Sequence, residues 1–267
     1  MNRLDTRFAK LRERGRKALI PFITAGDPSL EALVPVMHAA VGAGADVIEL
    51  GMPFSDPMAD GPVIQRSSER ALARGAGPDF VFESVRAFRE RDADTPVVLM
   101  GYLNPVEIRG PERYARQAAD AGVDGVLLVD LQPEEAGEFR AAFDAVGIAL
   151  VLLVSPTTGR ERLDKLCALA SGYLYYVSFA GVTGDSARLD AGAAGERLRA
   201  IRERAGVPVV VGFGIRDADS ARAMSVDADG VVVRSALVSA MEAADSPGSA
   251  ATAAAAFLAP LRAALDD

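Results

Sequence analysis

The chain has 267 residues, half of them hydrophobic, and a formal net charge of −8 at pH 7. This length and apolar content suit one large folded unit, so we predict a single domain over residues 1–267. The negative charge argues against nucleic acid and anionic membrane surfaces as partners. Cys167 is the single cysteine and cannot form a disulfide within the chain. Because we find neither the apolar run of a signal peptide nor a stretch of roughly 20 apolar residues, we expect a cytoplasmic protein.

The first expected element is an amphipathic N-terminal helix, because Leu4, Phe8 and Leu11 recur at helical spacing. Eight short apolar runs rich in β-branched residues follow it. They show little polar alternation, which is typical of parallel strands that are buried on both faces. The predicted strands are residues 18–24, 47–50, 97–100, 125–129, 149–154, 174–178, 209–212 and 230–233.

Segments with a helical period separate these strands, so strands and helices alternate along the chain. Several of the segments end at a glycine, which favours the left-handed residue that closes a helix. The Ala-rich tail, residues 249–265, has apolar residues at helical spacing and is expected to form a final helix. The other predicted helices are residues 30–41, 63–73, 80–88, 114–121, 134–143, 163–170, 198–201, 218–224 and 237–243.

Eight strand–helix units in one chain predict an α/β fold, a single (β/α)8 TIM barrel with an extra N-terminal helix. A closed barrel is favoured over an open doubly wound sheet because closure removes both sheet edges. The spacing between strands is longest after the second strand, and a polar segment follows the sixth. We therefore expect extended loops after strands 2 and 6. In such a barrel the active site forms at the carboxyl ends of the strands.

Glu49 is a carboxylate inside the otherwise apolar second strand, near its carboxyl end. Burying an unpaired carboxylate costs several kcal/mol, so Glu49 needs either a partner or a function. The structural interpretation is a hydrogen bond to a residue on a neighbouring strand, such as Tyr102 or Tyr175. The functional interpretation makes Glu49 a catalytic group, and the loop that follows it favours this interpretation.

That loop, residues 51–62, contains three prolines and two further carboxylates, Asp56 and Asp60. Long ordered loops at the catalytic face of a barrel commonly carry function. A carboxylate on an apolar strand and another on a polar loop can hold different pKa values and divide the acid and base roles. Glu49 and Asp60 are therefore the candidate catalytic pair. The alternative is that Asp56 or Asp60 caps a helix that begins near Pro62.

Residue types that are scarce in the chain narrow the chemistry further. The only lysines are Lys10, Lys17 and Lys165, and none follows a predicted strand, which argues against a Schiff-base aldolase. His38 is the only histidine and lies in a predicted helix, so histidine and cysteine ligands for zinc are lacking. We therefore predict acid–base chemistry without a metal ion.

A candidate phosphate site follows strands seven and eight, where TIM barrels frequently bind phosphate. Phe213 and Gly214 follow the seventh strand, and Arg234 and Ser235 follow the eighth and open a helix. Glycine lets the backbone approach a ligand closely, and the start of a helix supplies amide groups. The alternative is a structural turn. The segment 179–188 after the sixth strand is typical of a mobile lid over such a site.

With these residues in place, the sequence resembles the tryptophan synthase alpha subunit family along essentially its whole length. The matching motifs are PFITAGDP at 21–28, ELGMPFSDPMADGP at 49–62, GYLNP at 101–105, GVTG at 181–184 and GFGI at 212–215. The resemblance implies a lyase of tryptophan biosynthesis that cleaves indole-3-glycerol phosphate to indole and glyceraldehyde 3-phosphate, without a metal or organic cofactor. It implies that Glu49 protonates carbon 3 of the indole and takes the glycerol hydroxyl proton, while Asp60 accepts the indole N–H.

The resemblance also implies binding roles. Tyr175 would orient Glu49 or the glycerol chain, and Thr183 would hydrogen-bond Asp60 when the lid closes. Tyr102, after the third strand, is a further substrate-binding candidate. Apolar side chains would enclose the indole, although some of them are alternatively core residues: Phe22, Met100, Leu127, Leu153, Val177 and Phe213. The phosphate would receive backbone amides from Gly184, Gly214 and Ser235.

Three positions depart from the family pattern. Arg234 stands where the family has glycine, and it either weakens phosphate binding or adds a charged contact to the phosphate. Gln132 stands where proline is usual, and Phe179 replaces an arginine of many members. Gln132 bears on the contact with a partner, and Phe179 bears on the closure of the lid.

The family works as an αββα complex with a pyridoxal-phosphate beta subunit, so the resemblance implies that partner. The contact face would comprise Pro53, Asp56, Asn104 and Gln132. Two other functions stay open at this point. One is another phosphate-binding barrel, such as a sugar-phosphate isomerase or epimerase. The other is a binding or regulatory subunit without catalysis, which Arg234 makes conceivable.

Overall fold

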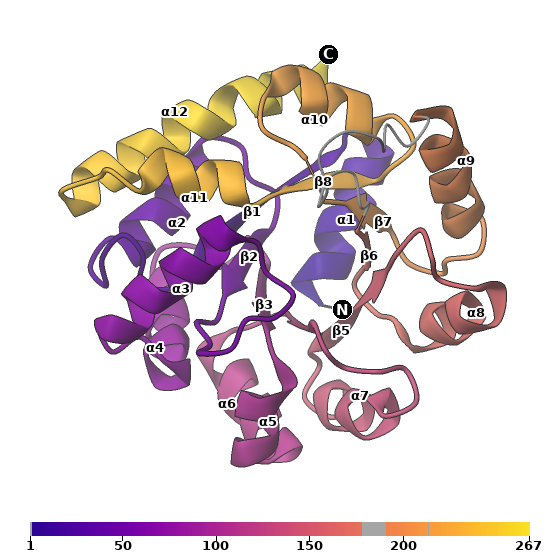
Figure 1. The fold of residues 1–267 in the computed structure, drawn as a ribbon, viewed down its shortest axis with the longest axis horizontal. Coiled ribbons are helices and arrows are strands. Elements are labelled where there is room, and N and C mark those ends of the chain that lie inside the picture. The colour runs from indigo at the N-terminus through magenta and orange to yellow at the C-terminus, as the bar shows by residue number, and fades with distance from the viewer. Residues whose placement is uncertain (1, 178–190, 213) are drawn as a thin grey trace.

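The computed structural model describes residues 2–177, 191–212 and 214–267, and of residues 191–194 only the backbone. Eight parallel strands form a closed barrel in which each strand pairs with the next and the eighth pairs with the first (Figure 1). The predicted (β/α)8 barrel is therefore confirmed. The strands are β1 (Ala18–Thr24), β2 (Ile48–Gly51), β3 (Val97–Gly101), β4 (Gly125–Leu128), β5 (Ala149–Val154), β6 (Leu174–Tyr176), β7 (Val209–Val211) and β8 (Gly230–Val233).

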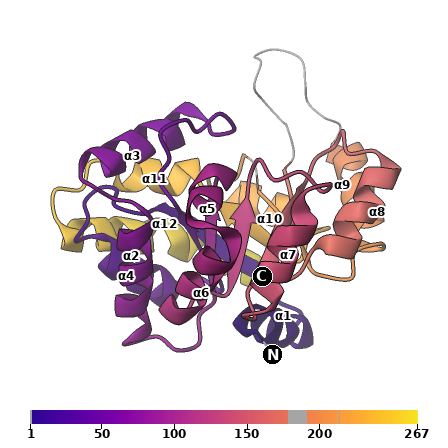
Figure 2. The same ribbon diagram turned by 90° about the horizontal axis from the view of Figure 1, so that it is seen from below.

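Helices surround the barrel, and the predicted N-terminal and final helices are both present. The first helix lies at one end of the barrel, on the far side from α3 (Figure 2). The helices are α1 (Arg3–Glu13), α2 (Leu33–Gly42), α3 (Pro62–Ala73), α4 (Pro78–Arg89), α5 (Leu103–Arg109), α6 (Pro111–Ala121), α7 (Ala136–Asp144), α8 (Arg160–Leu169), α9 (Ala191–Arg202), α10 (Ala218–Ser225), α11 (Ser235–Met241) and α12 (Pro247–Asp266).

The predicted elements differ from the observed ones mainly at their ends. Helix α5 was missed because its seven residues include Pro105 and are too few to show a helical period. The helix predicted at 198–201 is only the last part of α9, whose first half is rich in alanine and glycine. The extended loop after β2 is confirmed, since residues 52–61 separate β2 from α3. The loop predicted after β6 lies outside the described residues.

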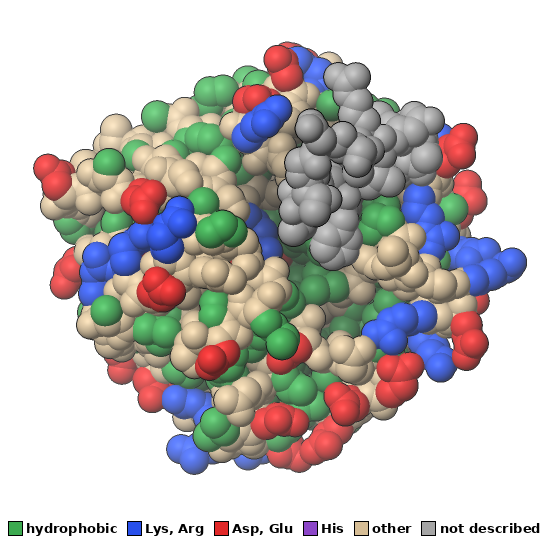
Figure 3. Space-filling view, in the orientation of Figure 1, with side chains coloured by type: hydrophobic (Ala, Val, Ile, Leu, Met, Phe, Trp, Pro, Cys, Tyr) green, Lys and Arg blue, Asp and Glu red, His purple; other side chains and the backbone are tan. Residues whose placement is uncertain are grey.

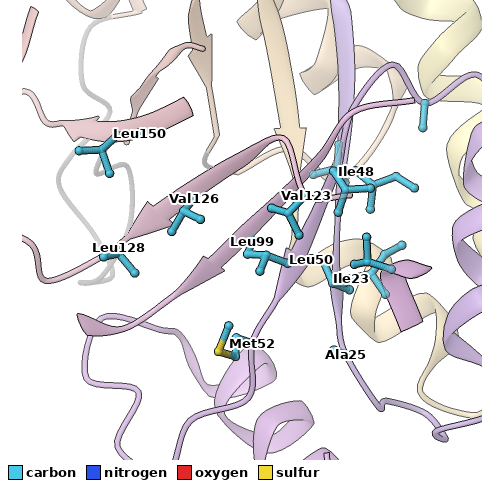
Figure 4. Close-up of a cluster of buried hydrophobic side chains, with 14 of the residues drawn as sticks. Ile23, Ala25, Ile48, Leu50, Met52, Leu99, Val123, Val126, Leu128 and Leu150 are labelled. Atoms are coloured by element: carbon cyan, nitrogen blue, oxygen red, sulfur yellow. The ribbon is translucent and has the colours of Figure 1, made fainter. Parts of the chain in front are cut away.

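Strand side chains alternate between two apolar layers. Those that point outward pack against the helices, as Ile23, Leu50 and Leu99 do (Figure 4). Those that point inward fill the barrel together with side chains of α1. The ring of Phe8 from α1 lies 5.8 Å from the ring of Tyr173, between centroids, so α1 closes one end of the barrel.

Four polar side chains form a ring at the amino-terminal end of the barrel. Each precedes an even-numbered strand and accepts a hydrogen bond from a backbone N–H at the start of the preceding strand. The pairs are Asp46 with Leu19 (3.0 Å), Asp124 with Val97 (2.9 Å), Ser171 with Leu150 (2.8 Å) and Asp229 with Val209 (2.8 Å). The aspartates also pair with arginines: Asp46 with Arg262, Asp124 with Arg3 and Arg89, and Asp229 with Arg202. We call these four residues the amino-terminal ring.

Helix α12 corrects one expectation from the sequence. Among the described residues it is the one helix that is long and apolar enough, by length and composition, to cross a membrane. The expectation that no such stretch exists was therefore wrong. The helix packs against α2, α10 and α11, and it buries Leu258, Leu261 and Leu265. These contacts on the outside of the barrel cover part of its apolar surface.

Candidate active site

Glu49 points into the barrel from β2. It is in register with Phe22 of β1 and Val98 of β3, two inward-facing residues, and its side chain is fully buried. The hydroxyl of Tyr173 donates a hydrogen bond to Glu49 Oε1 at 2.8 Å. The other carboxyl oxygen, Oε2, is buried without a hydrogen-bond partner among the described residues. Glu49 is therefore a carboxyl group with one free oxygen in an apolar surrounding.

This surrounding changes the acidity of Glu49. Burial raises its pKa from 4.5 to about 7, against the opposing effects of the Arg234 charge and the Tyr173 hydrogen bond. A group with a pKa near neutral pH can both give and take a proton under physiological conditions. The site thus contains a carboxyl group suited to general acid and base catalysis.

Asp60 lies on the loop after β2, and residues that follow two other strands, β3 and β8, bond to its carboxylate. Its Oδ2 accepts a hydrogen bond from the hydroxyl of Tyr102 at 3.0 Å, and its Oδ1 accepts one from Arg234 Nη2 at 2.6 Å. The cap position of α3 is Gly61, and no side chain caps that helix. The alternative that Asp56 or Asp60 is a helix cap was therefore wrong, because the Asp60 carboxylate is turned into the barrel mouth.

Arg234 connects the two sides of the site. It follows β8, forms an ion pair with Asp60, and its Cζ lies 4.6 Å from the ring centroid of Phe22. Its φ of −115° lies outside the left-handed region that favours glycine. The guanidinium contacts Asp60 and Phe22 at the barrel mouth.

A small cavity remains at the carboxyl end of the barrel, and this face of the molecule is hollowed near its centre (Figure 3). The volume of the cavity is about 10 Å³, which is room for about one water molecule. Five predicted site residues line it: Phe22, Asp60, Met100, Tyr102 and Arg234. Its other lining residues are Gly51, Met52, Ile64, Ser68, Gly101 and Val129.

The remaining predicted residues divide into three groups. Leu127 and Tyr175 face the barrel interior beneath the cavity, and Glu49 is not part of its lining. Gly214 and Ser235 are exposed at the ends of the adjacent strands β7 and β8 and do not line the cavity either. Gly214 has a φ of +71°, a conformation that favours glycine. Thr183, Gly184, Phe213 and Phe179 lie outside the described residues.

The structural interpretation of Glu49, which was the alternative to a catalytic role, named the wrong tyrosines as its partner. Neither Tyr102 nor Tyr175 bonds to it, and Tyr173 does. Tyr173 directly precedes β6 and is two residues before Tyr175, and both side chains lie in the inner apolar cluster. A period of two extended by one residue beyond the strand could have identified both tyrosines. The Tyr175 hydroxyl is buried without a hydrogen-bond partner among described residues. A Cβ on Gly212 would lie 2.1 Å from that hydroxyl oxygen, so glycine at 212 makes room for Tyr175.

The described part of the chain contains no group of three or more His, Cys, Asp or Glu side chains that could hold a metal ion. A closed parallel barrel with carboxyl groups gathered at the carboxyl ends of its strands is the architecture of a TIM-barrel enzyme.

Comparisons with known proteins identify the family. The model of the family "Tryptophan synthase alpha chain" matches residues 8–265. A tryptophan synthase alpha chain from Xanthomonas oryzae pv. oryzae is 71% identical over 266 residues, which is 100% of this chain and 99% of that protein. The crystal structure of tryptophan synthase subunit alpha from Legionella pneumophila has a TM-score of 0.92 at 44% identity and covers 100% of this chain and 99% of that chain. A structure of Mycobacterium tuberculosis tryptophan synthase has a TM-score of 0.88 at 34% identity and covers 100% of this chain and 99% of that chain.

The chain belongs to the tryptophan synthase alpha chain family. It is a lyase of the alpha-subunit type, and the reaction of this family is the cleavage of indole-3-glycerol phosphate in tryptophan biosynthesis.

Proposed function

We propose that Glu49 and Asp60 carry out the cleavage as an acid–base pair. Protonated Glu49 gives its proton to carbon 3 of the indole, which turns a poor carbanion leaving group into a neutral one. The resulting carboxylate takes the proton of the glycerol hydroxyl, and the carbon–carbon bond breaks with its electron pair returning to the indole ring. Asp60 accepts a hydrogen bond from the indole N–H and stabilises the positive charge that forms on the ring.

One observation carries this proposal: Glu49 is fully buried with a free carboxyl oxygen and a pKa of about 7. An apolar surrounding keeps the proton on the carboxyl group until substrate arrives, which a general acid requires. Asp60, by contrast, is bonded to Arg234 and Tyr102. The two carboxyl groups therefore have the different surroundings that separate roles need.

The substrate-binding residues are part of the same proposal. Phe22 and Leu127 enclose the indole, Tyr102 positions Asp60, and Tyr175 orients Glu49 or the glycerol chain. Gly214 and Ser235, exposed at the ends of adjacent strands, offer backbone amides to the phosphate together with Gly184. Thr183 and Phe213 complete the site as substrate-binding residues.

Indole release tests the catalytic roles. The full chain is incubated with indole-3-glycerol phosphate, alone and with a tryptophan synthase beta subunit, and both products are measured. We expect indole and glyceraldehyde 3-phosphate in equal amounts, and a loss of about three orders of magnitude in Glu49→Gln. Glu69→Gln, an exposed glutamate of α3, is the matched control and should retain the rate. An unchanged rate in Glu49→Gln would overturn the mechanism, and no indole under either condition would favour a non-catalytic subunit.

A beta subunit is the proposed partner, in an αββα complex, through the face that comprises Pro53, Asp56, Asn104 and Gln132. Two large apolar side chains near this face support the proposal, because Met58 is 83% exposed and Ile108 is 78% exposed. Sedimentation of the chain mixed with a beta subunit tests it, and Met58→Asp should weaken the complex.

We further propose that the protein is cytoplasmic and has a single domain. Because its net charge is negative, we expect it to bind neither nucleic acid nor membranes.

A further inference from the structure

Arg234 covers the two side chains that an indole ring has to contact. Its guanidinium donates a hydrogen bond to Asp60 at 2.6 Å and lies over the ring of Phe22, with Cζ 4.6 Å from the centroid. The cavity that remains beside these groups has room for about one water molecule. In this arrangement the guanidinium is paired with one oxygen of Asp60 and lies over the Phe22 ring that would meet an indole.

In its inward position the guanidinium faces both Asp60 and the hydroxyl of Tyr175. Nη2 is bonded to Asp60, whereas Nε is buried and has no hydrogen-bond partner among the described residues. The side chain is 24% exposed, so it reaches solvent at the barrel mouth. Arginine keeps its charge at all physiological pH values and binds phosphate oxygens in a bidentate manner. A second anion at this mouth would therefore compete with Asp60 for the guanidinium.

The position of Arg234 in the chain favours such an exchange. It directly precedes Ser235, which is exposed at the end of β8, and β8 pairs with β7, whose end leads to exposed Gly214. The proposed phosphate site is thus within the reach of a side chain that begins one residue away from it. A rotation of the side chain exchanges one ion pair for another, and no covalent bond changes.

We propose that Arg234 is a specificity-determining residue that couples phosphate binding to indole binding: the phosphate draws the guanidinium from Asp60, and the freed carboxylate then accepts the indole N–H. This inference rests on the proposed function of Asp60. An indole compound without a phosphate has to break the ion pair with no replacement, so it binds weakly. This coupling selects phosphorylated substrates. A ligand shifts the equilibrium between Arg234 paired with Asp60 and Arg234 turned away from it only by its differential affinity for these two states.

A binding experiment with two simple probes tests the coupling. Indole is titrated into the full chain by ligand-observed NMR, with and without inorganic phosphate, at an ionic strength matched with sodium chloride. In the unchanged chain we expect phosphate to tighten indole binding about tenfold, and indole to tighten phosphate binding by the same factor. In Arg234→Met, which keeps the length and apolar cover of the side chain, we expect indole to bind about tenfold more tightly without phosphate, with no further effect of phosphate.

Controls separate the charge of Arg234 from other effects. Arg222→Met removes an arginine of α10 that pairs with Asp267 away from the cavity, and it should keep the full coupling. Arg234→Lys retains the charge without the planar fork and should keep a smaller coupling of the same sign. The inference is overturned if phosphate does not change indole binding in the unchanged chain, or if Arg234→Met shows the same coupling. Coupling without cleavage of indole-3-glycerol phosphate would overturn the proposed function alone, and cleavage without coupling would overturn this inference alone.

Discussion

The two ends of the barrel use buried carboxyl groups in opposite ways. In the amino-terminal ring, Asp124 accepts a hydrogen bond from Val97 and pairs with both Arg3 and Arg89. At the carboxyl end, Glu49 has one hydrogen bond, and its second oxygen has no partner among the described residues. Burial raises the pKa of both groups, and it raises that of Glu49 to about 7. The amino-terminal ring therefore serves stability, whereas the carboxyl end keeps a proton available at a cost in stability.

Glu49→Gln should sharpen this comparison most strongly, because we expect it to lower activity and raise stability. The pKa of Glu49 is about 7 in the folded chain and 4.5 as the ordinary value, so the folded state binds more protons between these values. Stability therefore falls as the pH rises from 4.5 through 7. At pH 8 the variant should gain up to about 3 kcal/mol in the free energy of unfolding and lose about three orders of magnitude in rate.

Urea unfolding at pH 4.5 and pH 8, together with the indole assay, measures both effects. The gain in stability should be confined to the higher pH. A variant that is less stable than the unchanged chain at pH 8 would show that Glu49 is an ordinary structural carboxylate, and the comparison would fail.

Asp124→Ala should have the opposite result. The change leaves the Val97 N–H and the mostly buried Arg89 without their carboxylate, so we expect a loss of about 3–5 kcal/mol in the free energy of unfolding. The rate of indole release by the folded fraction should stay unchanged, because Asp124 is at the far end of the barrel. Urea unfolding measures the loss. The control is Asp144→Ala, since Asp144 is half exposed and pairs with Arg140 one turn away, and it should cost below about 1 kcal/mol.

Tyr173→Phe tests how the hydroxyl of Tyr173 affects the pKa of Glu49. Removing the hydroxyl removes a hydrogen bond that lowers the pKa of Glu49, so that pKa should rise further. The pH above which the rate declines should then move upward, because protonated Glu49 persists to higher pH. We expect a rate change within about tenfold at neutral pH, as is typical for one hydrogen bond to a charged group. A pH profile of kcat that does not move would show that the Tyr173 hydrogen bond does not set the pKa of Glu49.

Ser171→Ala should give the smallest effect. Ser171 takes the place of an aspartate in the amino-terminal ring and accepts a hydrogen bond from the Leu150 N–H at 2.8 Å. Losing this bond should cost about 1 kcal/mol in the free energy of unfolding and leave the pH profile of activity unchanged. Thermal unfolding at one pH is sufficient to measure it. A loss as large as that of Asp124→Ala would mean that the charges of the ring contribute little.

The barrel itself could be predicted from the sequence because each strand is an apolar run buried on both faces. Strands β1, β5 and β8 have the predicted ends. Helix α5 was missed because seven residues with a proline carry too weak a period. The expectation that no stretch is apolar enough to cross a membrane was wrong at α12 for a different reason. A helix that covers a barrel and a helix that crosses a membrane can have similar compositions. The contacts of α12 with other helices show which of the two it is.

The position of the candidate site could be predicted in part. Glu49 and Asp60 could be singled out as candidates because a carboxylate in an apolar strand is costly and a proline-rich loop is unusual. The Tyr173 hydrogen bond and the ion pair between Asp60 and Arg234 were not, since each joins side chains more than a hundred residues apart in the chain. The direction of the Arg234 side chain depends on which anion it pairs with, and the sequence alone does not identify that anion.

The most direct test of the account is the titration of the Glu49 carboxyl carbon by NMR in the full chain labelled with carbon-13 glutamate. The spectrum of Glu49→Gln identifies the resonance by its absence. We expect this carbon to titrate near pH 7 and to titrate at higher pH in Tyr173→Phe. A resonance that titrates near pH 4.5 would show that Glu49 is ionised at neutral pH, and it would contradict the role of Glu49 as the proton donor.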